Sequence, residues 1–256
     1  MTHVARINIA PVRSLGLEHR EAVELTERGV LEDRRFFLRD PDNTRVVDQL
    51  IAGTMVQVKA WTDPEATRLR LTFPDGTVVD DEVQLGEPVE TPIHHRTGMG
   101  HDVVGPWSAA LSEFLDREVV VVRCDRPGGT RSGKPTTLVS DGSLDAIGAV
   151  LGAGAVDSRR FRMLFELEGA EPHVEDTWVG GCVSVGEAVL RVGGGVARCA
   201  MTTHDPETGM RDLDTLRAIK DYRGLTDGKD LMFGVWADVV RPGWVRVGDE
   251  IALEPA

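Results

Sequence analysis

The chain has 256 residues, 41% of them hydrophobic, which is enough to build the core of one large domain or of two smaller ones. Lys and Arg number 29 against 42 Asp and Glu, so the net charge is −13 and a nucleic acid backbone would be repelled. No segment has the apolar length of a signal peptide or of a membrane-spanning helix, so we expect a cytoplasmic protein with neither nucleic acid nor a membrane as partner. The cysteines are odd in number and widely spaced, so each is expected to be a free thiol: Cys124, Cys182 and Cys199.

Short β-branched segments in the first half predict strands over residues 4–9, 21–25, 35–38 and 69–73. A helix is expected to begin at Pro106, a favourable first-turn residue, and to present its apolar residues on one face. This helix would end near Asp116, and a new strand would follow it. We therefore place a domain boundary between residues 1–118 and residues 119–256.

The second half continues in the same β-rich pattern and predicts strands over 119–122, 183–185, 189–192, 235–240 and 245–247. Helices are expected from about Asp141 and from about Asp212, where leucine and isoleucine recur at helical spacing. Strands therefore outnumber helices in both halves. The sequence predicts an α+β protein with barrel-like sheets.

Residues 128–134, GGTRSGK, fit the first seven positions of a phosphate-binding P-loop. The eighth position is Pro135 in place of the Ser or Thr hydroxyl that binds magnesium, and proline also removes a backbone donor. We therefore interpret the segment as a mobile or anion-contacting surface loop.

The segment HHRTGMGHD contains residues that ligate first-row metals, namely His94, His95, His101 and Asp102. Their positions give no helical or strand pair that would aim two of them at one ion. A solvated loop is the expected structure of this glycine-rich segment.

The most specific segment is residues 193–209, GGGVARCAMTTHDPETG. Its three glycines follow a predicted strand and are expected to turn the chain and to let the backbone approach something bulky. Arg198 would favour the thiolate of Cys199, the form that acts as nucleophile or soft-metal ligand, if both project into one pocket. The alternative is a buried cysteine that acts as a small hydrophobe, and DPETG is first of all a turn signal.

The chain resembles MOSC domain proteins, named after the molybdenum cofactor sulfurase C-terminus, in RCAMTTHDPETG, in the helix DTLRAIKDYRG and in the ending FGVWADVVRPGWVRVGDEIAL. Residues 11–40 look like the opening of the N-terminal β-barrel domain that accompanies MOSC in the amidoxime-reducing group. TTLVSDGSLDAIGAVL and RRFRMLFELEGAEPHVEDTW are similar to the family's middle segments, whereas residues 41–105 match least. The resemblance implies a β-barrel-rich MOSC domain and a smaller N-terminal β-barrel-like domain.

The resemblance also implies a cofactor site. It places Cys199 at the position that ligates molybdenum in the amidoxime-reducing group, as metal ligand and catalytic residue. The guanidinium group of arginine donates paired hydrogen bonds to anionic phosphate and dithiolene groups. An arginine considered alone would nevertheless more often form a surface salt bridge. The residues implied around a molybdopterin are Arg13, Ser14, Arg34 and Arg162 on its phosphate and ring edges, with Arg198, and with Thr203 and Asp205 holding the Cys199 loop.

Three functional hypotheses follow from the resemblance. The first is an oxidoreductase that reduces small N-hydroxylated compounds at molybdenum, with electrons from a separate flavin or iron–sulfur partner, since the scattered cysteines hold no cluster. The second is a non-catalytic module that binds the molybdenum cofactor or carries sulfur on Cys199 as a persulfide. The third is an apo relative with a decayed pocket, because Leu164 replaces the family's amide and Gly195-Val196 its frequent proline-cysteine. Pyridoxal phosphate binding is taken as a label of the family only.

Overall fold

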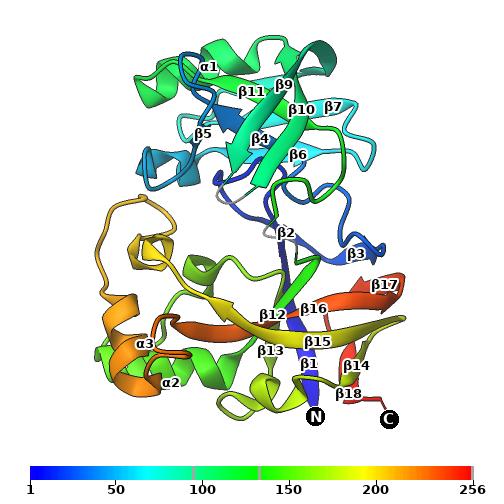
Figure 1. The fold of residues 1–256 in the computed structure, drawn as a ribbon, viewed down its shortest axis with the longest axis vertical. Coiled ribbons are helices and arrows are strands. Elements are labelled where there is room, and N and C mark those ends of the chain that lie inside the picture. The colour runs from blue at the N-terminus through cyan, green and yellow to red at the C-terminus, as the bar shows by residue number, and fades with distance from the viewer. Residues whose placement is uncertain (94–95, 132–133, 255–256) are drawn as a thin grey trace.

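The computed structural model describes residues 1–93, 96–131 and 134–254, which form two bodies stacked along the longest axis (Figure 1). The strands are β1 (Thr2–Ile9), β2 (Glu18–Arg20), β3 (Ala22–Leu25), β4 (Phe36–Arg39), β5 (Val46–Val47), β6 (Lys59–Thr62), β7 (Arg68–Thr72), β8 (Val78–Glu82), β9 (Gln84–Ile93), β10 (Arg96–Val104), β11 (Val120–Cys124), β12 (Thr136–Ser140), β13 (Phe165–Glu168), β14 (Cys182–Val185), β15 (Ala188–Ala197), β16 (Met232–Arg241), β17 (Gly243–Arg246) and β18 (Glu250–Leu253). The helices are α1 (Trp107–Leu115), α2 (Asp141–Leu151) and α3 (Thr215–Arg223), and the 3-10 turns are η1 (Gly53–Gln57), η2 (Ser158–Phe161), η3 (Val174–Trp178) and η4 (Ala200–Thr203). Within these described ranges, no helix is both long and apolar enough to cross a membrane.

The larger body is a closed barrel of seven strands. They follow the order β13, β12, β16, β15, β14, β18 and β1, and β1 pairs back onto β13 to close the ring. Ile7 and Ile9 of β1 are fully buried in its core because successive strand side chains point to opposite faces, and Val4 joins them across a register shift between Val4 and Arg6. Figure 1 shows α2 and α3 together beside the barrel. The prediction of a barrel-rich α+β fold is confirmed.

The smaller body holds a five-stranded sheet, β5-β4-β11-β10-β9, and a three-stranded sheet, β6-β7-β8. Trp107 at the start of α1 is fully buried, and its indole N–H donates to the carbonyl of Leu69 at 2.9 Å. The expected N-terminal barrel domain is confirmed. The N-terminal segment of the chain is not confined to this smaller body, however. Strand β1 lies in the larger barrel, and β3 pairs with β17. The boundary between residues 1–118 and 119–256 stays a prediction.

The third helix and the histidine-rich segment differ from their predictions. The third helix begins at Thr215, not at Asp212, because the Asp214 carboxylate caps it by accepting from the amide of Arg217. Residues 96–102 of the HHRTGMGHD segment lie in β10 and do not form a loop. A Cβ at Gly100 would overlap the neighbouring strand, so the glycine permits close pairing instead of marking a turn.

The histidine segment does not gather its described members around one point. His101 is paired with Asp125, Nδ1 to Oδ1 at 2.9 Å, whereas Asp102 accepts from Arg39 Nη2 at 2.6 Å. His94 and His95 lie outside the described residues.

The glycine run 193–195 lies inside β15 and does not turn the chain. The expected approach to something bulky is nevertheless present, since a Cβ at Gly193 would overlap the indole ring of Trp236 on β16. The pairing of β15 with β16 shifts register at Val192 and again after Gly195, which accommodates the ring.

Replacing Gly193 by alanine is expected to lower the free energy of unfolding by about 2 kcal/mol, because the methyl group forces the Trp236 ring or the strand to move. Urea denaturation followed by far-UV circular dichroism measures the change. Gly181→Ala is the control, since its Cβ would approach a single backbone oxygen only. Equal stabilities of the two variants would contradict this explanation of the glycine run.

Candidate functional site

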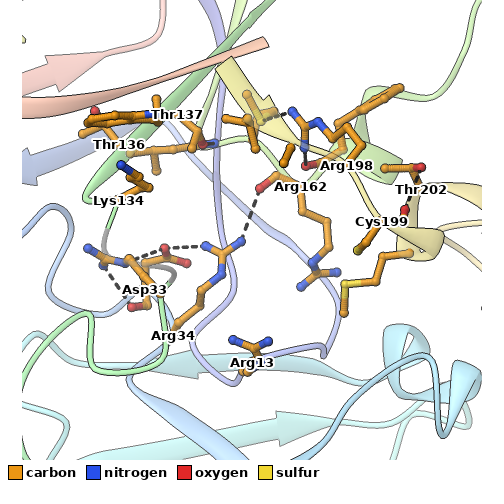
Figure 2. Close-up of a pocket in the computed structure, with 18 of the residues that line it drawn as sticks. Arg13, Asp33, Arg34, Lys134, Thr136, Thr137, Arg162, Arg198, Cys199 and Thr202 are labelled. Atoms are coloured by element: carbon orange, nitrogen blue, oxygen red, sulfur yellow. Dashed lines mark hydrogen bonds and ion pairs between the residues drawn. The ribbon is translucent and has the colours of Figure 1, made fainter. Parts of the chain in front are cut away.

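A cavity of about 450 Å³ lies between the two bodies and is lined from both. The smaller body contributes the loop after β1, with Arg13, and the loop before β4, with Arg34. The barrel contributes the end of η2 with the segment after it, the end of β15 and residues of η4. Segments that are far apart in sequence therefore meet at one site (Figure 2).

The structure brings most of the predicted site residues to this cavity. Six of them line it: Arg13, Ser14, Arg34, Arg162, Arg198 and Cys199. Figure 2 shows the guanidinium groups of Arg13, Arg34 and Arg162 turned toward a common space, with Cys199 on the Arg162 side. Thr203 and Asp205 are not part of the lining.

Cys199 has an exposed side chain at the point where β15 ends and η4 begins. Its carbonyl accepts from the Thr202 amide and hydroxyl, both at 3.2 Å, and the Thr202 hydroxyl lies 2.7 Å from that of Thr215 on α3. The backbone beneath the sulfur is therefore fixed while the thiol stays accessible. The buried-hydrophobe alternative describes Cys124 instead, where burial raises the thiol pKa to about 12.

Three of the cavity residues have strained backbones. Ser14, Arg34 and Arg162 lie in the left-handed region with φ of 69°, 53° and 51°. This region is costly for residues with a Cβ and persists where the surrounding structure enforces it, often at functional sites. The strain aims the two guanidinium groups and the hydroxyl into one cavity.

Asp33 fixes the position of Arg34, one of the cations that line the cavity. Its buried carboxylate accepts from Arg34 Nη1 at 2.6 Å, from Arg131 Nε at 3.1 Å and from the Ala10 amide at 2.8 Å. Burial alone would raise the Asp33 pKa, but the two guanidinium groups and the amide outweigh it and hold the pKa below its ordinary value. Arg34 also donates from Nη2 to the carbonyl of Arg162 at 3.3 Å.

Asp33→Asn is expected to cost about 3 to 5 kcal/mol of stability at pH 7, because Arg131 stays buried without its counter-charge. The folded-state pKa of Asp33 is lowered, so its contribution is complete above the unfolded pKa of about 3.9 and is lost as the pH falls through the folded value. Urea denaturation of both proteins at pH 7 and at about pH 3 measures this. A stability difference that grows on acidification would contradict the assignment.

Arg162 is the most electrostatically crowded of these cations. Its pKa is lowered to about 9, chiefly by burial and in addition by Arg34 and Arg13, while Asp33 opposes the shift. The guanidinium is still protonated at neutral pH, and its Nη2 donates to the Leu15 carbonyl at 2.7 Å. An anion in the cavity would relieve this crowding.

Ser14 provides an independent sign of a polar ligand. Its hydroxyl is buried, lines the cavity and has no hydrogen-bond partner among the described residues. A buried hydroxyl without a partner is costly, so its position is explained if a ligand completes it. Converging arginines, an unpaired hydroxyl and an accessible thiol fit an anionic group with a soft metal.

Arg198 lines the cavity, but its guanidinium group binds backbone carbonyls. Its Nε donates to the Phe233 carbonyl at 2.8 Å and its Nη1 to the Phe161 carbonyl at 2.9 Å, over the Phe161 ring. Burial lowers its pKa to about 9, opposed by Cys199. Arg198 therefore shares the cavity with the thiol, but its guanidinium is committed to backbone carbonyls.

Thr203 and Asp205 stabilise the loop that follows the cysteine. The Thr203 hydroxyl donates to the Ala200 carbonyl at 2.7 Å. Asp205 Oδ1 accepts from the amides of Glu207 and Thr208 at 3.0 and 2.7 Å, which is a turn-forming pattern. Neither side chain lines the cavity, and Asp205 also lies 3.6 Å from Arg160 Nη2 through its Oδ2.

Sequence reasoning missed several lining residues, among them Thr130, Arg131, Lys134, Arg160 and Trp236. The first three belong to the GGTRSGK segment, so its interpretation as an anion-contacting loop was the available signal; residues 132–133 lie outside the described ranges. The Lys134 ammonium lies 3.0 Å from the centre of the Trp236 ring.

Two family models together match both halves of this chain. A family model described as MOSC domain matches residues 121–252, and one described as MOSC N-terminal beta barrel domain matches residues 1–118.

Mitochondrial amidoxime-reducing component 1 of Mus musculus is 32% identical over 127 residues, which are 46% of this chain and 36% of that protein. Molybdenum cofactor sulfurase of Caenorhabditis elegans is 25% identical over 246 residues, which are 88% of this chain and 32% of that protein. The chain thus spans about a third of the length of these curated relatives. Among solved structures, the YUAD protein of Bacillus subtilis aligns over 98% of this chain and 94% of its own, with 12% identity and a TM-score of 0.45.

Proposed function

Because the chain belongs to the MOSC domain family, we propose that its cavity binds a molybdenum–pterin cofactor and that the protein reduces small N-hydroxylated compounds. One observation carries the proposal: an accessible thiol, Cys199, lies on the same cavity as the converging cations Arg13, Arg34 and Arg162. These cations gather in a chain whose net charge is −13. The local charge therefore suits an anionic ligand that the surface as a whole would repel.

Each group has a role that follows from its chemistry. Arg34 and Arg162 would hold phosphate oxygens and ring edges through paired N–H donors, and the unpaired Ser14 hydroxyl would complete its hydrogen bonding on the same ligand. The Cys199 thiolate would ligate molybdenum, which when bound supplies the redox chemistry that removes oxygen from an N-hydroxylated substrate. Met163 and Leu164, both buried, give the cavity wall an apolar part.

Electrons are proposed to come from a separate flavin or iron–sulfur protein. The three cysteines lie apart, with Cys124 buried in the smaller body and Cys199 at the cavity, so they do not form a cluster site. The relatives named amidoxime-reducing components support a reductase over a purely structural role.

A second candidate function is a cofactor or sulfur carrier. The relatives named molybdenum cofactor sulfurase match 88% of this chain, a larger share than the amidoxime-reducing components match. In this function Cys199 would carry sulfane sulfur as a persulfide, which its exposure permits.

An assay with benzamidoxime and a surrogate reductant separates the two functions. The reductase predicts turnover by protein purified from a molybdate-fed host. The carrier predicts cofactor or sulfane sulfur on the protein without turnover. Protein that lacks both would contradict the two proposals together and favour a decayed pocket, in which Leu164 has replaced a hydrogen-bonding amide.

A further inference from the structure

Arg160 on η2 is a buried cation that none of the roles above uses. Its side chain is 5% exposed, and its Nη1 and Nη2 donate to the two carboxylate oxygens of Asp212, each at 2.6 Å. Asp205 Oδ2 lies 3.6 Å from Nη2. This paired geometry is the strongest form of a guanidinium–carboxylate contact, and a lysine does not reproduce it.

The carboxylates that Arg160 holds belong to the loop that carries the thiol. The Asp212 amide donates to the Thr203 carbonyl at 3.1 Å. The Thr203 hydroxyl donates in turn to the carbonyl of Ala200, the residue directly after Cys199. A short series of hydrogen bonds therefore connects the Arg160 guanidinium to the turn beneath the sulfur.

The C-terminal end of η2 leads to Arg162, one of the cations that line the cavity. Phe161 and Arg162 follow Arg160 directly, and Arg162 projects into the cavity. The Phe161 carbonyl also accepts from Nη1 of Arg198, the residue directly before Cys199. The turn η2 thus contacts the chain on both sides of the cysteine, and Arg160 itself lines the same cavity.

Arg159 offers a matched comparison. It is also on η2 and also reaches the loop, through Nη1 to Glu207 Oε1 at 2.6 Å. That carboxylate is 69% exposed, and Arg159 is bound on its other side by Asp157. Exposed pairs of this kind contribute little. In the Arg160 pair the guanidinium is 5% exposed, although the Asp212 carboxylate is 42% exposed, and its two parallel N–H contacts fix the geometry.

We propose that Arg160 is a positioning residue for Cys199: by clamping Asp212 it holds the cysteine loop at a fixed place relative to Arg162. The inference rests on the proposed role of Cys199 as a ligand. Without the clamp, the loop is free to carry the sulfur away from the cavity cations, which lowers the reactivity of the thiol as well as its fit to a ligand.

The test uses cofactor-free full-length protein in a Cys182→Ser background, in which Cys199 is the exposed thiol and Cys124 stays buried. The second-order rate constant for alkylation of Cys199 by iodoacetamide is measured by mass spectrometry, together with the thermal midpoint. Arg160→Met is expected to lower the rate constant by about fivefold. Arg159→Met is expected to stay within about twofold of the parent.

The decisive variant is Arg160→Met with Asp212→Asn. It removes one positive and one negative charge, so its net charge equals that of the parent, and it leaves neither member of the pair without its counter-charge, which restores much of the stability. The proposal predicts that this double variant recovers the thermal midpoint while its alkylation rate stays about fivefold low. Recovery of both quantities shows that the pair only stabilises the fold and overturns the proposal, as does an unchanged rate in Arg160→Met.

The outcome is separate from that of the proposed function. If the purified parent protein contains no molybdenum, the cofactor proposal fails, whereas the alkylation rates still decide whether Arg160 positions Cys199.

Discussion

Cys199→Ser is expected to lower benzamidoxime reduction by about a thousandfold, well beyond the ten- to hundredfold typical of residues that only support a metal ligand. A hydroxyl at this position stays protonated and is a poor ligand where a soft thiolate is required. The substitution should leave the fold intact, because the Cys199 side chain is exposed and its sulfur makes no hydrogen bond with the described residues. Activity per mole of protein and the thermal midpoint are measured together.

Cys182→Ser is the matched control, since Cys182 on β14 lies outside the cavity. It should keep the activity of the parent protein. Retention of activity in Cys199→Ser at the same molybdenum content would contradict the role of the thiolate.

Arg162→Met is expected to weaken cofactor binding by about ten- to a hundredfold, which corresponds to the loss of a charged hydrogen-bonded contact. The cofactor-free variant should be at least as stable as the parent, because one of three crowded cations is removed. The prediction thus combines loss of cofactor with no loss of stability. It is checked by molybdenum analysis after gel filtration and by the thermal midpoint.

Most strands and the first two helices could be predicted because their signals are local. Val120–Cys124 and Met232–Arg241 are β-branched segments, and the predicted helices near 106 and 141 begin within a residue of α1 and α2. The glycine run 193–195 misled because glycine normally marks a turn, whereas here it makes room for Trp236 across the strand pair. The cross-strand partner of a glycine cannot be read from the residues beside it.

Some residues of the site could likewise be predicted from the sequence, and others could not. The resemblance predicted eight site residues, and six of them line one cavity in the structure. Arg160 could not be found, because its importance depends on a contact with Asp212, 52 residues later in the chain. Asp212 itself was placed at a helix start, where an acidic residue is normally a cap. Asp205 was expected to hold the Cys199 loop through backbone bonds, and its carboxylate accepts from the amides of Glu207 and Thr208 in that loop.

Metal analysis of the purified protein tests the central claim most directly. The parent chain from a molybdate-fed host is predicted to contain molybdenum in a ratio approaching one per chain, with pterin fluorescence after oxidation, and Cys199→Ser to contain much less. A parent protein with neither metal nor pterin, or equal metal in both proteins, would contradict a molybdenum centre held by this cysteine.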